Sequence, residues 1–359
     1  MSGGRARPAR PAWRGFSRVT LALAACAAAA LLPAAGCSHS RQSQKKTVVV
    51  YTSQDQVYAE PVFLEFQRRT GIEVQPVYDG ESAKNTGLIA RLLAKKDRPD
   101  CDVFWSGEMI QTERLGQEGL LEPYVSPQAE RFPPQFRDPE GRWTGFAGRM
   151  RVIIYNTNLV KPGEAPSGLK DFVDPKWRGK AVMGVPFYGT VLTHMAALHQ
   201  LWGPRRLSSF LADLRANDVA LAPGNGPSRD MVADGRKAFG LTDTDDAHGA
   251  VLDGKPVAIV IPDAEEGALF MPNTVALIRN CPHGEEGRKL IDYLLSAEVE
   301  KQLAAARAAQ IPLAKDLADV KTPWSSLPGY GKVMALDVPK AAASVPALVK
   351  LLQDARMDQ

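Results

Sequence analysis

Hydrophobic runs alternate with amphipathic stretches along the first third of the chain. The run TVVVYTS (47–53) is rich in β-branched residues, which is typical of a strand with both faces buried. In the following stretch (58–71), Val62, Phe63 and Phe66 recur at helical spacing and Gly71 is a stop signal. The alternation continues with a strand, a helix, a strand and a helix, expected at 72–78, 85–97, 101–106 and 109–120. Strands that alternate with helices predict a parallel α/β sheet.

A proline-rich segment (121–143) interrupts this pattern, and the alternation restarts after it. The apolar stretch GRMRVIIYNTNL (148–159) predicts a new strand, and a second α/β unit runs from about residue 150 to 265. Its strands and helices are expected at 181–185, 190–203, 205–217, 219–222, 228–235 and 237–242. The chain then returns through the segment 255–263, a strand at 273–279 and one long helix at 284–307. Residues 316–359 are expected to be helical and peripheral.

The N-terminal segment has the pattern of an export signal. Five arginines and no acidic residue precede an apolar run from Val19 to Leu32. This run is shorter than the length that a transmembrane helix needs. The run ends in Ala-Ala-Gly-Cys37, which resembles a bacterial lipoprotein signal; the alternative is an ordinary secretory signal cleaved nearby. We therefore expect a signal peptide at 1–36 and a polar tether at 37–46. The mature protein would be exported to the periplasmic side of a membrane and anchored there by lipid on Cys37.

Removal of this signal changes the charge of the protein. The formal charge of the whole chain is +4, and five of its arginines lie in the signal, so the mature chain is close to neutral. Nucleic acid is therefore not expected as a partner. Of the four cysteines, Cys101 and Cys281 remain in the mature domain, either as a disulfide or as two buried thiols. We favour two buried thiols.

Acidic residues follow one of the predicted strands. In parallel sheets, ligands bind beyond the carboxyl ends of the strands. The stretch FGLTDTDDA (239–247) ends its apolar part at Leu241, so Thr242, Asp243, Thr244 and Asp245 are expected to emerge there. The alternative is a helix N-cap with an acidic first turn, and both can hold at once. An EF-hand is excluded, because the positions that need an oxygen ligand and a glycine are Ala and His.

Two further segments carry candidate anion-binding groups. The segment GNGPSRD (224–230) predicts a helix start capped by Asn225 or Ser228, whose free backbone N–H groups would attract an anion. Arg149 and Arg151 flank a single residue of a predicted strand. We expect at most one of these two arginines to face a ligand.

Motifs of the common enzyme classes are missing from the sequence. We find no HExxH, GxSxG or CxxC pattern, and no phosphate-binding GxxxxGK followed by Ser or Thr. His194 and His199 lie five residues apart on one predicted helix, so they do not share a face as zinc ligands four residues apart would. We therefore expect a binding protein rather than an enzyme. The alternative from another class is an exported metal-dependent hydrolase that uses the same acidic residues.

The order of these segments resembles a periplasmic solute-binding protein of an ABC importer, of the type that binds ferric iron with a small anion. The motifs are VVVYTSQD, TGIEV, CDVFWSGE, GLLEPY, GRMRVIIYNT, DPKWRGKAVMGVP, ADGRKAFGLTDTDD and PNTVALI, and the likeness spans about residues 47 to 352. It implies an α/β fold of type II, in which two lobes of mainly parallel sheet are joined by two crossing strands and enclose the ligand. The expected lobes are 47–148 with 266–315, and 149–265, with 316–359 packing on them as a helical segment.

The resemblance also implies site residues. Asp55 and Glu108 match loop positions that can supply a metal ligand. An anion would be held by the turn at Tyr188, Gly189 and Thr190, by Asn225, and by Arg149 or Arg151. The full set of expected ligand contacts is Ser53, Gln54, Asp55, Glu108, Arg149, Arg151, Tyr188, Gly189, Thr190, Asn225, Thr242, Asp243 and Asp245. The expected metal ligands are Asp55, Glu108 and Asp245.

One feature of the iron-binding type is missing. Two adjacent tyrosines would complete the ferric site, and Thr244 and Asp245 stand at their positions. Phenolate is a strong, hard ligand for ferric iron, whereas threonine and aspartate supply only hard oxygen ligands. The first expectation is ferric iron or a metal ion with a synergistic anion as the transported ligand, and no cofactor. The alternative is a small organic solute such as a phosphonate or an amine. The expected partner of this monomer is a membrane permease.

Overall fold

Two sets of parallel strands are joined by antiparallel strands in the computed structural model, which describes residues 45–79, 86–262 and 266–358. The strands are β1 (Thr47–Thr52), β2 (Glu73–Tyr78), β3 (Val103–Ser106), β4 (Leu121–Glu122), β5 (Thr144–Asn156), β6 (Ala181–Gly184), β7 (Ala220–Ala222), β8 (Phe239–Asp243), β9 (Val257–Val260) and β10 (Phe270–Ile278). The α-helices are α1 (Gln56–Thr70), α2 (Thr86–Ala94), α3 (Ile110–Gln117), α4 (Lys170–Val173), α5 (Gly189–Ala216), α6 (Asn225–Ala233), α7 (Thr244–Leu252), α8 (Gly284–Leu294), α9 (Ala297–Ala305) and α10 (Val338–Asp354).

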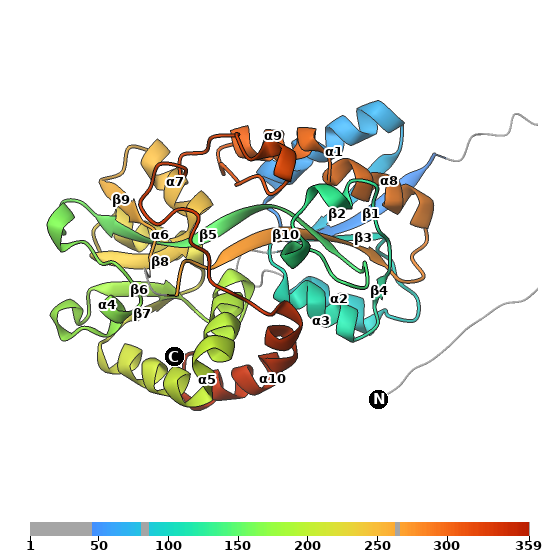
Figure 1. Ribbon diagram of the computed structural model, residues 1–359. Helices are drawn as coiled ribbons and strands as arrows, with labels where there is room; N and C mark the ends of the chain where they lie inside the picture. Colours follow the sequence, from blue (N-terminus) through green and yellow to red (C-terminus); the bar gives the residue numbers. More distant parts are fainter. Residues whose placement is uncertain (1–44, 80–85, 263–265, 359) are drawn as a thin grey trace, which may run out of the picture. The chain divides into compact units, whose positions relative to one another are not determined.

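Strand β5 connects the two sets. In the first sheet, β1 lies between β2 and β3 in parallel, and β10 runs antiparallel to β3, β4 and β5. In the second sheet, β6 lies between β7 and β8 in parallel, and β8 and β9 run antiparallel to β5. The first part of β5 pairs with β10 and its second part with β8 and β9, so this strand passes from one sheet into the other (Figure 1). All 13 of its residues are buried. The predicted α/β class is confirmed, with mixed strand directions.

Helices cover both faces of the sheets. Apolar residues of α1, α8 and α9 pack with β1 and β3 in one cluster, on one face of the first sheet (Figure 1). Residues of α6 and α7 pack with β5 and β6 in a second cluster. The third cluster contains residues of α2, α3, α5 and α10. It also includes residues from strands of both sheets, such as Phe104 on β3 and Phe239 on β8. Burial on both faces explains why the strands read as continuous apolar runs.

Helix signals in the sequence are mostly confirmed. Gly71 ends α1 in the left-handed conformation, with φ 69°, which glycine adopts without a steric penalty. The helices expected at 190–203 and 205–217 form α5, which breaks at Gly203 with φ 74° just before Pro204. The single helix expected at 284–307 was wrong. It is divided into α8 and α9, because the Ser296 side chain accepts a hydrogen bond from Val299 N and caps a new helix.

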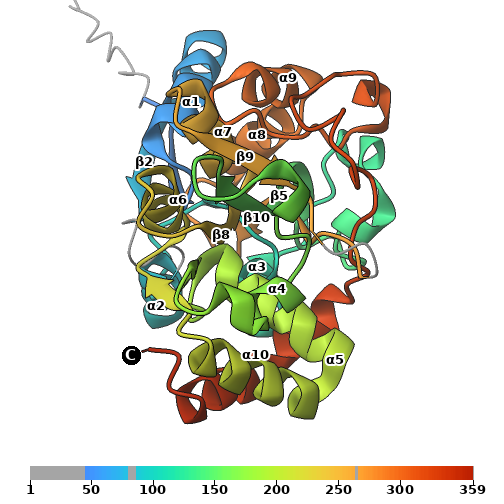
Figure 2. The same ribbon diagram turned by 90° about the vertical axis from the view of Figure 1, so that its left-hand side faces the viewer.

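The C-terminal segment differs from its prediction. Of residues 315–358, which the structure describes, only α10 and a short 3₁₀ turn at Lys315–Leu317 are helical. Helix α10 packs against α5 and α3 and lies beside α5 in Figure 2. Ala341, Leu348 and Leu352 are fully buried, so α10 is part of the core rather than peripheral. Its apolar residues recur every three or four positions, the pattern of a helix with one buried face.

The remaining predictions on organisation have mixed outcomes. Contacts join residues 45–358 into one compact unit, so the division into two lobes stays a prediction. Cys101 and Cys281 are both free thiols, as favoured, although Cys281 is only partly buried. Among the described helices, none combines the length and the apolar character that crossing a membrane requires. The signal at 1–36, Cys37 and most of the tether lie outside the described residues.

Candidate functional site

A polar cavity of about 150 Å³ lies where β5 meets the N-terminal ends of several helices. Asp55 and Tyr58 come from the start of α1, and Arg149 from β5. Tyr188, Thr190 and Val191 come from the start of α5, and Gly224 and Asn225 from the start of α6. The lining is completed by Val185, Arg229, Asp243, Asp245, Asp246, Gly249 and Arg307. Helix N-termini carry partial positive charge and unpaired N–H groups, so these ends favour an anion.

The run of acidic residues lies at the junction of β8 and α7. Asp243 is the last residue of β8 and the N-cap of α7, but its side chain makes no capping hydrogen bond. Asp245 and Asp246 lie in the first turn of α7, where the helix dipole stabilises negative charge. One carboxylate oxygen from each of the three lies within 4.8 Å of the others. The acidic first turn and the cavity-facing position, the two alternatives from the sequence, therefore occur together.

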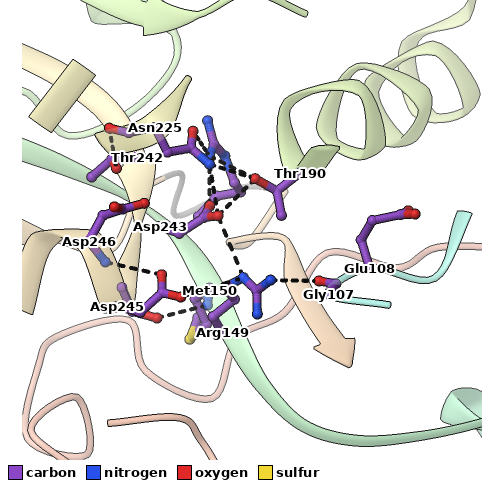
Figure 3. A network of polar contacts seen from close by, with 12 residues as sticks. Gly107, Glu108, Arg149, Met150, Thr190, Asn225, Thr242, Asp243, Asp245 and Asp246 are labelled. Atoms are coloured by element: carbon purple, nitrogen blue, oxygen red, sulfur yellow. Dashed lines mark hydrogen bonds and ion pairs between the residues drawn. The ribbon is translucent and has the colours of Figure 1, made fainter. Parts of the chain in front are cut away.

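Hydrogen bonds hold the Asp243 carboxylate on both oxygens (Figure 3). Arg151 Nη1 donates to Asp243 Oδ1 at 2.6 Å. Thr190 Oγ1 donates to Asp243 Oδ2 at 2.7 Å, and Asn225 Nδ2 donates to the same oxygen at 2.9 Å. Asn225 also accepts from Arg151 Nη1 at 2.7 Å. The three donors come from β5, α5 and α6, so this carboxylate connects the starts of two helices to the sheet.

Arg149 lies close to the Asp243 carboxylate and to that of Asp245. Its Nη2 donates to Gly107 O at 2.8 Å and its Nη1 to Asn273 Oδ1 at 3.3 Å. Its Nε lies 3.6 Å from Asp243 Oδ2 and 3.8 Å from Asp245 Oδ2. Burial would lower the pKa of Arg149, but the neighbouring carboxylates, Asp245 first, more than offset it and raise the pKa overall. The guanidinium is therefore a permanent positive charge at the cavity wall.

The predicted contacts divide into two groups. Seven of them line the cavity: Asp55, Arg149, Tyr188, Thr190, Asn225, Asp243 and Asp245. The other six lie outside its lining: Ser53, Gln54, Glu108, Arg151, Gly189 and Thr242. Of the two arginines on β5, only Arg149 lines the cavity. Residues two apart on a strand point to the same face, so this difference comes from the packing that buries Arg151 against Asp243 and not from side-chain alternation.

Most residues of the second group support residues of the lining. Ser53 Oγ accepts from Gly107 N at 2.8 Å, and Gln54 Nε2 donates to Asn273 Oδ1 at 2.6 Å. Both bonds therefore stabilise groups that bind Arg149. Thr242 Oγ1 donates to Asn225 O at 3.2 Å, which holds the first residue of α6. That helix begins one residue after Gly224, so the expected capping by Asn225 or Ser228 was wrong.

Glu108 occupies a different environment from the one expected. Its carboxylate accepts hydrogen bonds from Ile110 N at 2.7 Å, from Gln111 N at 3.1 Å and from Thr193 Oγ1 at 2.7 Å. The side chain is 1% exposed and points away from the three aspartates in Figure 3. Burial raises its pKa. Glu108 therefore binds backbone N–H groups at the start of α3 and a hydroxyl group of α5. This position does not support the prediction that Glu108 is a metal ligand.

Four polar residues of the cavity lining were not predicted as ligand contacts from the sequence: Tyr58, Arg229, Asp246 and Arg307. Asp246 belongs to the acidic run already considered. Tyr58 lies three residues after Asp55, and Arg229 four residues after Asn225, so helical spacing could have found both. Arg307 follows α9 and has no local signal. Burial, and then the charges of Asp245 and Asp55, raise the pKa of Tyr58, so its phenol is a neutral hydrogen-bond donor.

Comparisons with known proteins agree with this architecture. Residues 101–328 match the family model described as bacterial extracellular solute-binding protein. Iron uptake protein A1 of Synechocystis is 25% identical over 313 residues, covering 81% of this chain and 85% of that protein. A periplasmic protein of Salmonella typhi named for binding 2-aminoethylphosphonate is 25% identical over 257 residues, covering 70% and 72%.

A solved structure shows the same fold. Iron-bound HitA from Pseudomonas aeruginosa superposes with a TM-score of 0.76 at 21% sequence identity, covering 86% of this chain and 99% of that one. This likeness confirms the fold that the order of strands and helices predicted. The family model spans more than half of the chain. The protein therefore belongs to the family of bacterial extracellular solute-binding proteins.

Proposed function

We propose that this protein is the substrate-binding component of an ABC importer, and that it captures a small ligand with both cationic and anionic groups. The observation that carries the proposal is the cavity itself, where three clustered carboxylates face Arg149 and the N-terminal ends of α5 and α6. Oxygen ligands suit a hard cation, and helix N-termini suit an anion. The partner is a membrane permease, and no bond in the ligand is made or broken.

A metal ion with a small anion is the first candidate for the ligand. Asp245 and Asp246 supply carboxylates that lie in the cavity beside Asp243, and Asp55 supplies another from α1. The name of the Synechocystis relative, iron uptake protein A1, supports iron as the metal. Thr244 and Asp245 stand at the positions of the two tyrosines of the ferric type, so these positions supply no phenolate. The Thr244 hydroxyl oxygen already accepts a hydrogen bond from Met150 N. Carboxylates would then supply the hard oxygen ligands.

The second candidate is a small organic solute that combines an amine with a phosphonate. An ammonium group donates three hydrogen bonds, which three clustered carboxylates can accept. A phosphonate would be bound by Arg149 and by the N–H groups at the starts of α5 and α6. The name of the Salmonella relative supports this alternative. Both candidates use the same two sides of the cavity.

Native mass spectrometry of protein purified without refolding tests the proposal, because a retained ligand is identified by its mass. Calorimetry then measures binding of ferric citrate, of ferric iron with phosphate or carbonate, and of 2-aminoethylphosphonate. We expect one of them to bind at a single site. No binding, together with metal-dependent turnover of a model ester that is lost in Asp245→Ala, would instead favour the exported hydrolase.

The proposed location follows from the family and the N-terminal sequence. Extracellular solute-binding proteins act outside the cytoplasm, which fits the signal pattern at 1–36. We propose that lipid on Cys37 holds the protein at the membrane that contains the permease. The polar residues after Cys37 would then act as the tether between the anchor and the folded domain.

A further inference from the structure

Arg307 stands at the edge of the cavity, where the chain leaves helix α9. Its side chain lines the cavity and is 48% exposed, whereas the side chain of Arg149 is 10% exposed. A side chain that touches both the cavity and the solvent lies at the rim. Arg307 is therefore part of the boundary that a ligand crosses on this side of the cavity.

The guanidinium of Arg307 binds helix α7. Its Nη2 donates to Gly249 O at 3.1 Å and to Asp253 Oδ1 at 2.6 Å. Asp253 directly follows the last residue of α7, where the helix dipole disfavours a negative charge. The hydrogen bond from Arg307 is the largest cause of a lowered pKa at Asp253, so the carboxylate is charged. The two residues form an ion pair that compensates the unfavourable position of this carboxylate.

This ion pair joins two parts of the fold that pack separately. Val299 and Leu303 of α9 belong to the hydrophobic cluster that contains residues of β1 and β3. Ala247 and Ala250 of α7 belong to the cluster that contains residues of β5 and β6. Both helices lie above β5 in Figure 1. A tilt of one part against the other would therefore move α9 relative to α7 and strain or break the contact made by Arg307.

Asp253 has no place in the cavity itself. It is absent from the lining, and its side chain is 55% exposed. Asp253 therefore acts on the cavity through Arg307 rather than by touching a ligand. Exposed ion pairs contribute little to the stability of a fold, so this contact can open and close without unfolding of the protein.

We propose that Arg307 and Asp253 form a latch at the cavity rim, which holds the cavity closed and sets the rate at which a bound ligand leaves. While the pair is formed, α9 stays fastened to α7. When the pair breaks, the two parts tilt apart and the rim widens. This inference rests on the proposed function, since it concerns release from the same cavity.

Pulsed electron spin resonance of the ligand-free protein measures the closure directly. Spin labels at the exposed positions Leu64 on α1 and Leu159 after β5 report the distance between the two parts, in a Cys281→Ala background. Asp253→Asn and Arg307→Gln should each raise the ratio of longer to shorter distances about two- to fivefold, the effect of one exposed ion pair. The double variant should show no further increase, because the same contact is lost.

The rate of release is the second readout. Stopped-flow measurements use ferric citrate or 2-aminoethylphosphonate, whichever of the two binds. Asp253→Asn and Arg307→Gln should release it about two- to fivefold faster than the wild type at low salt. The difference should shrink in high salt, which screens exposed charges. If Arg307 acted only as a ligand contact, Asp253→Asn would release the probe at the wild-type rate.

The matched control is Asp234→Asn. Asp234 follows the last residue of α6 and pairs with Lys255 at 3.1 Å and at similar exposure, but both residues lie outside the cavity lining and Arg307 does not bind them. This variant should leave the distances and the release rate unchanged. Unchanged distances in both latch variants overturn the inference, whatever the release rates, and binding of a probe would still leave the proposed function standing. Failure of both probes to bind counts against the proposed function, while the distances in the ligand-free protein still decide the latch.

Discussion

Arg151 and Asp243 face each other as direct partners across strands β5 and β8, and Arg151 Nη1 lies 2.6 Å from Asp243 Oδ1. Both side chains are buried, and Asp243 lines the cavity whereas Arg151 does not. A buried ion pair needs hydrogen bonds on its remaining atoms, which Thr190 and Asn225 supply to the carboxylate. Asp243 is therefore a fixed part of the framework, whereas Asp245 is partly exposed in the cavity.

Replacing Arg151 by methionine should lower the free energy of unfolding by about 3 to 5 kcal/mol, because the buried Asp243 carboxylate would lose its direct partner and keep only the more distant Arg149, 3.6 Å away. Denaturant titration measures this change. In the double variant Arg151→Met with Asp243→Asn, the loss should be smaller than the sum of the two single losses, since no unpaired charge remains. Additive losses would contradict a direct interaction between the two residues.

Asp245→Asn should weaken ligand binding by about tenfold or more, because hydrogen bonds to charged groups contribute about 1.5 to 3 kcal/mol. Its effect on unfolding should stay below about 1 kcal/mol, the usual value of a charge at a helix N-terminus. Calorimetry with the ligand found by mass spectrometry measures the affinity. Asp218→Asn, an exposed aspartate outside the cavity lining, is the control. Unchanged affinity in Asp245→Asn would remove this carboxylate from the site.

Thr193 on α5 and Glu108 before α3 share a buried hydrogen bond of 2.7 Å. Thr193→Val removes the donor and leaves the carboxylate short of a partner, so we expect a loss of about 1 to 3 kcal/mol in unfolding free energy. Thr193→Ser keeps the hydroxyl and should lose less. A loss in Thr193→Ser without a loss in Thr193→Val would instead attribute the effect to packing of the methyl group, which valine keeps and serine lacks.

The His194 side chain makes stability depend on pH. Burial, and then the charge of Arg151, lower its pKa from 6.5 to about 3. The unfolded chain binds this proton below pH 6.5 and the folded chain does not, so stability is present above pH 6.5 and is lost as the pH falls towards 3. His194→Gln should therefore lose less stability between pH 7 and pH 4 than wild type does. Parallel losses in denaturant titrations at the two pH values would contradict this.

Substitution of Cys37 tests the sequence-based prediction of a lipid anchor. With Cys37→Ser, lipid cannot be attached, and the protein should move from the membrane fraction to the soluble fraction of the cell envelope. Phase partitioning in detergent and incorporation of labelled fatty acid measure the difference. A wild-type protein that is already soluble, with an N-terminus elsewhere, would favour the ordinary secretory signal.

Local patterns were sufficient for much of the fold. The run at 47–53, the spacing of Val62, Phe63 and Phe66 and the stop at Gly71 correspond to β1 and α1. They succeed because hydrophobic period and glycine conformation act over a few residues. The join at Ser296 was missed, because a serine cap inside a continuous helical pattern is a weak signal.

The sequence by itself determined the α/β class, the order of elements and the position of acidic residues at the end of β8, because these follow from local hydrophobic periodicity. The rule that ligands bind beyond strand ends then indicated where a site should lie. Only the tertiary structure decided which of these residues meet. Arg149 and Arg151 lie on the same face of β5, but the packing around them leaves Arg149 in the cavity lining and buries Arg151 against Asp243. Glu108 lies just after the end of β3, as Asp243 lies at the end of β8, yet packing turns Glu108 towards α3 and α5. Arg307 reaches the cavity from far along the chain. Such contacts depend on the crossing of β5 between sheets, and no short stretch of sequence encodes that geometry.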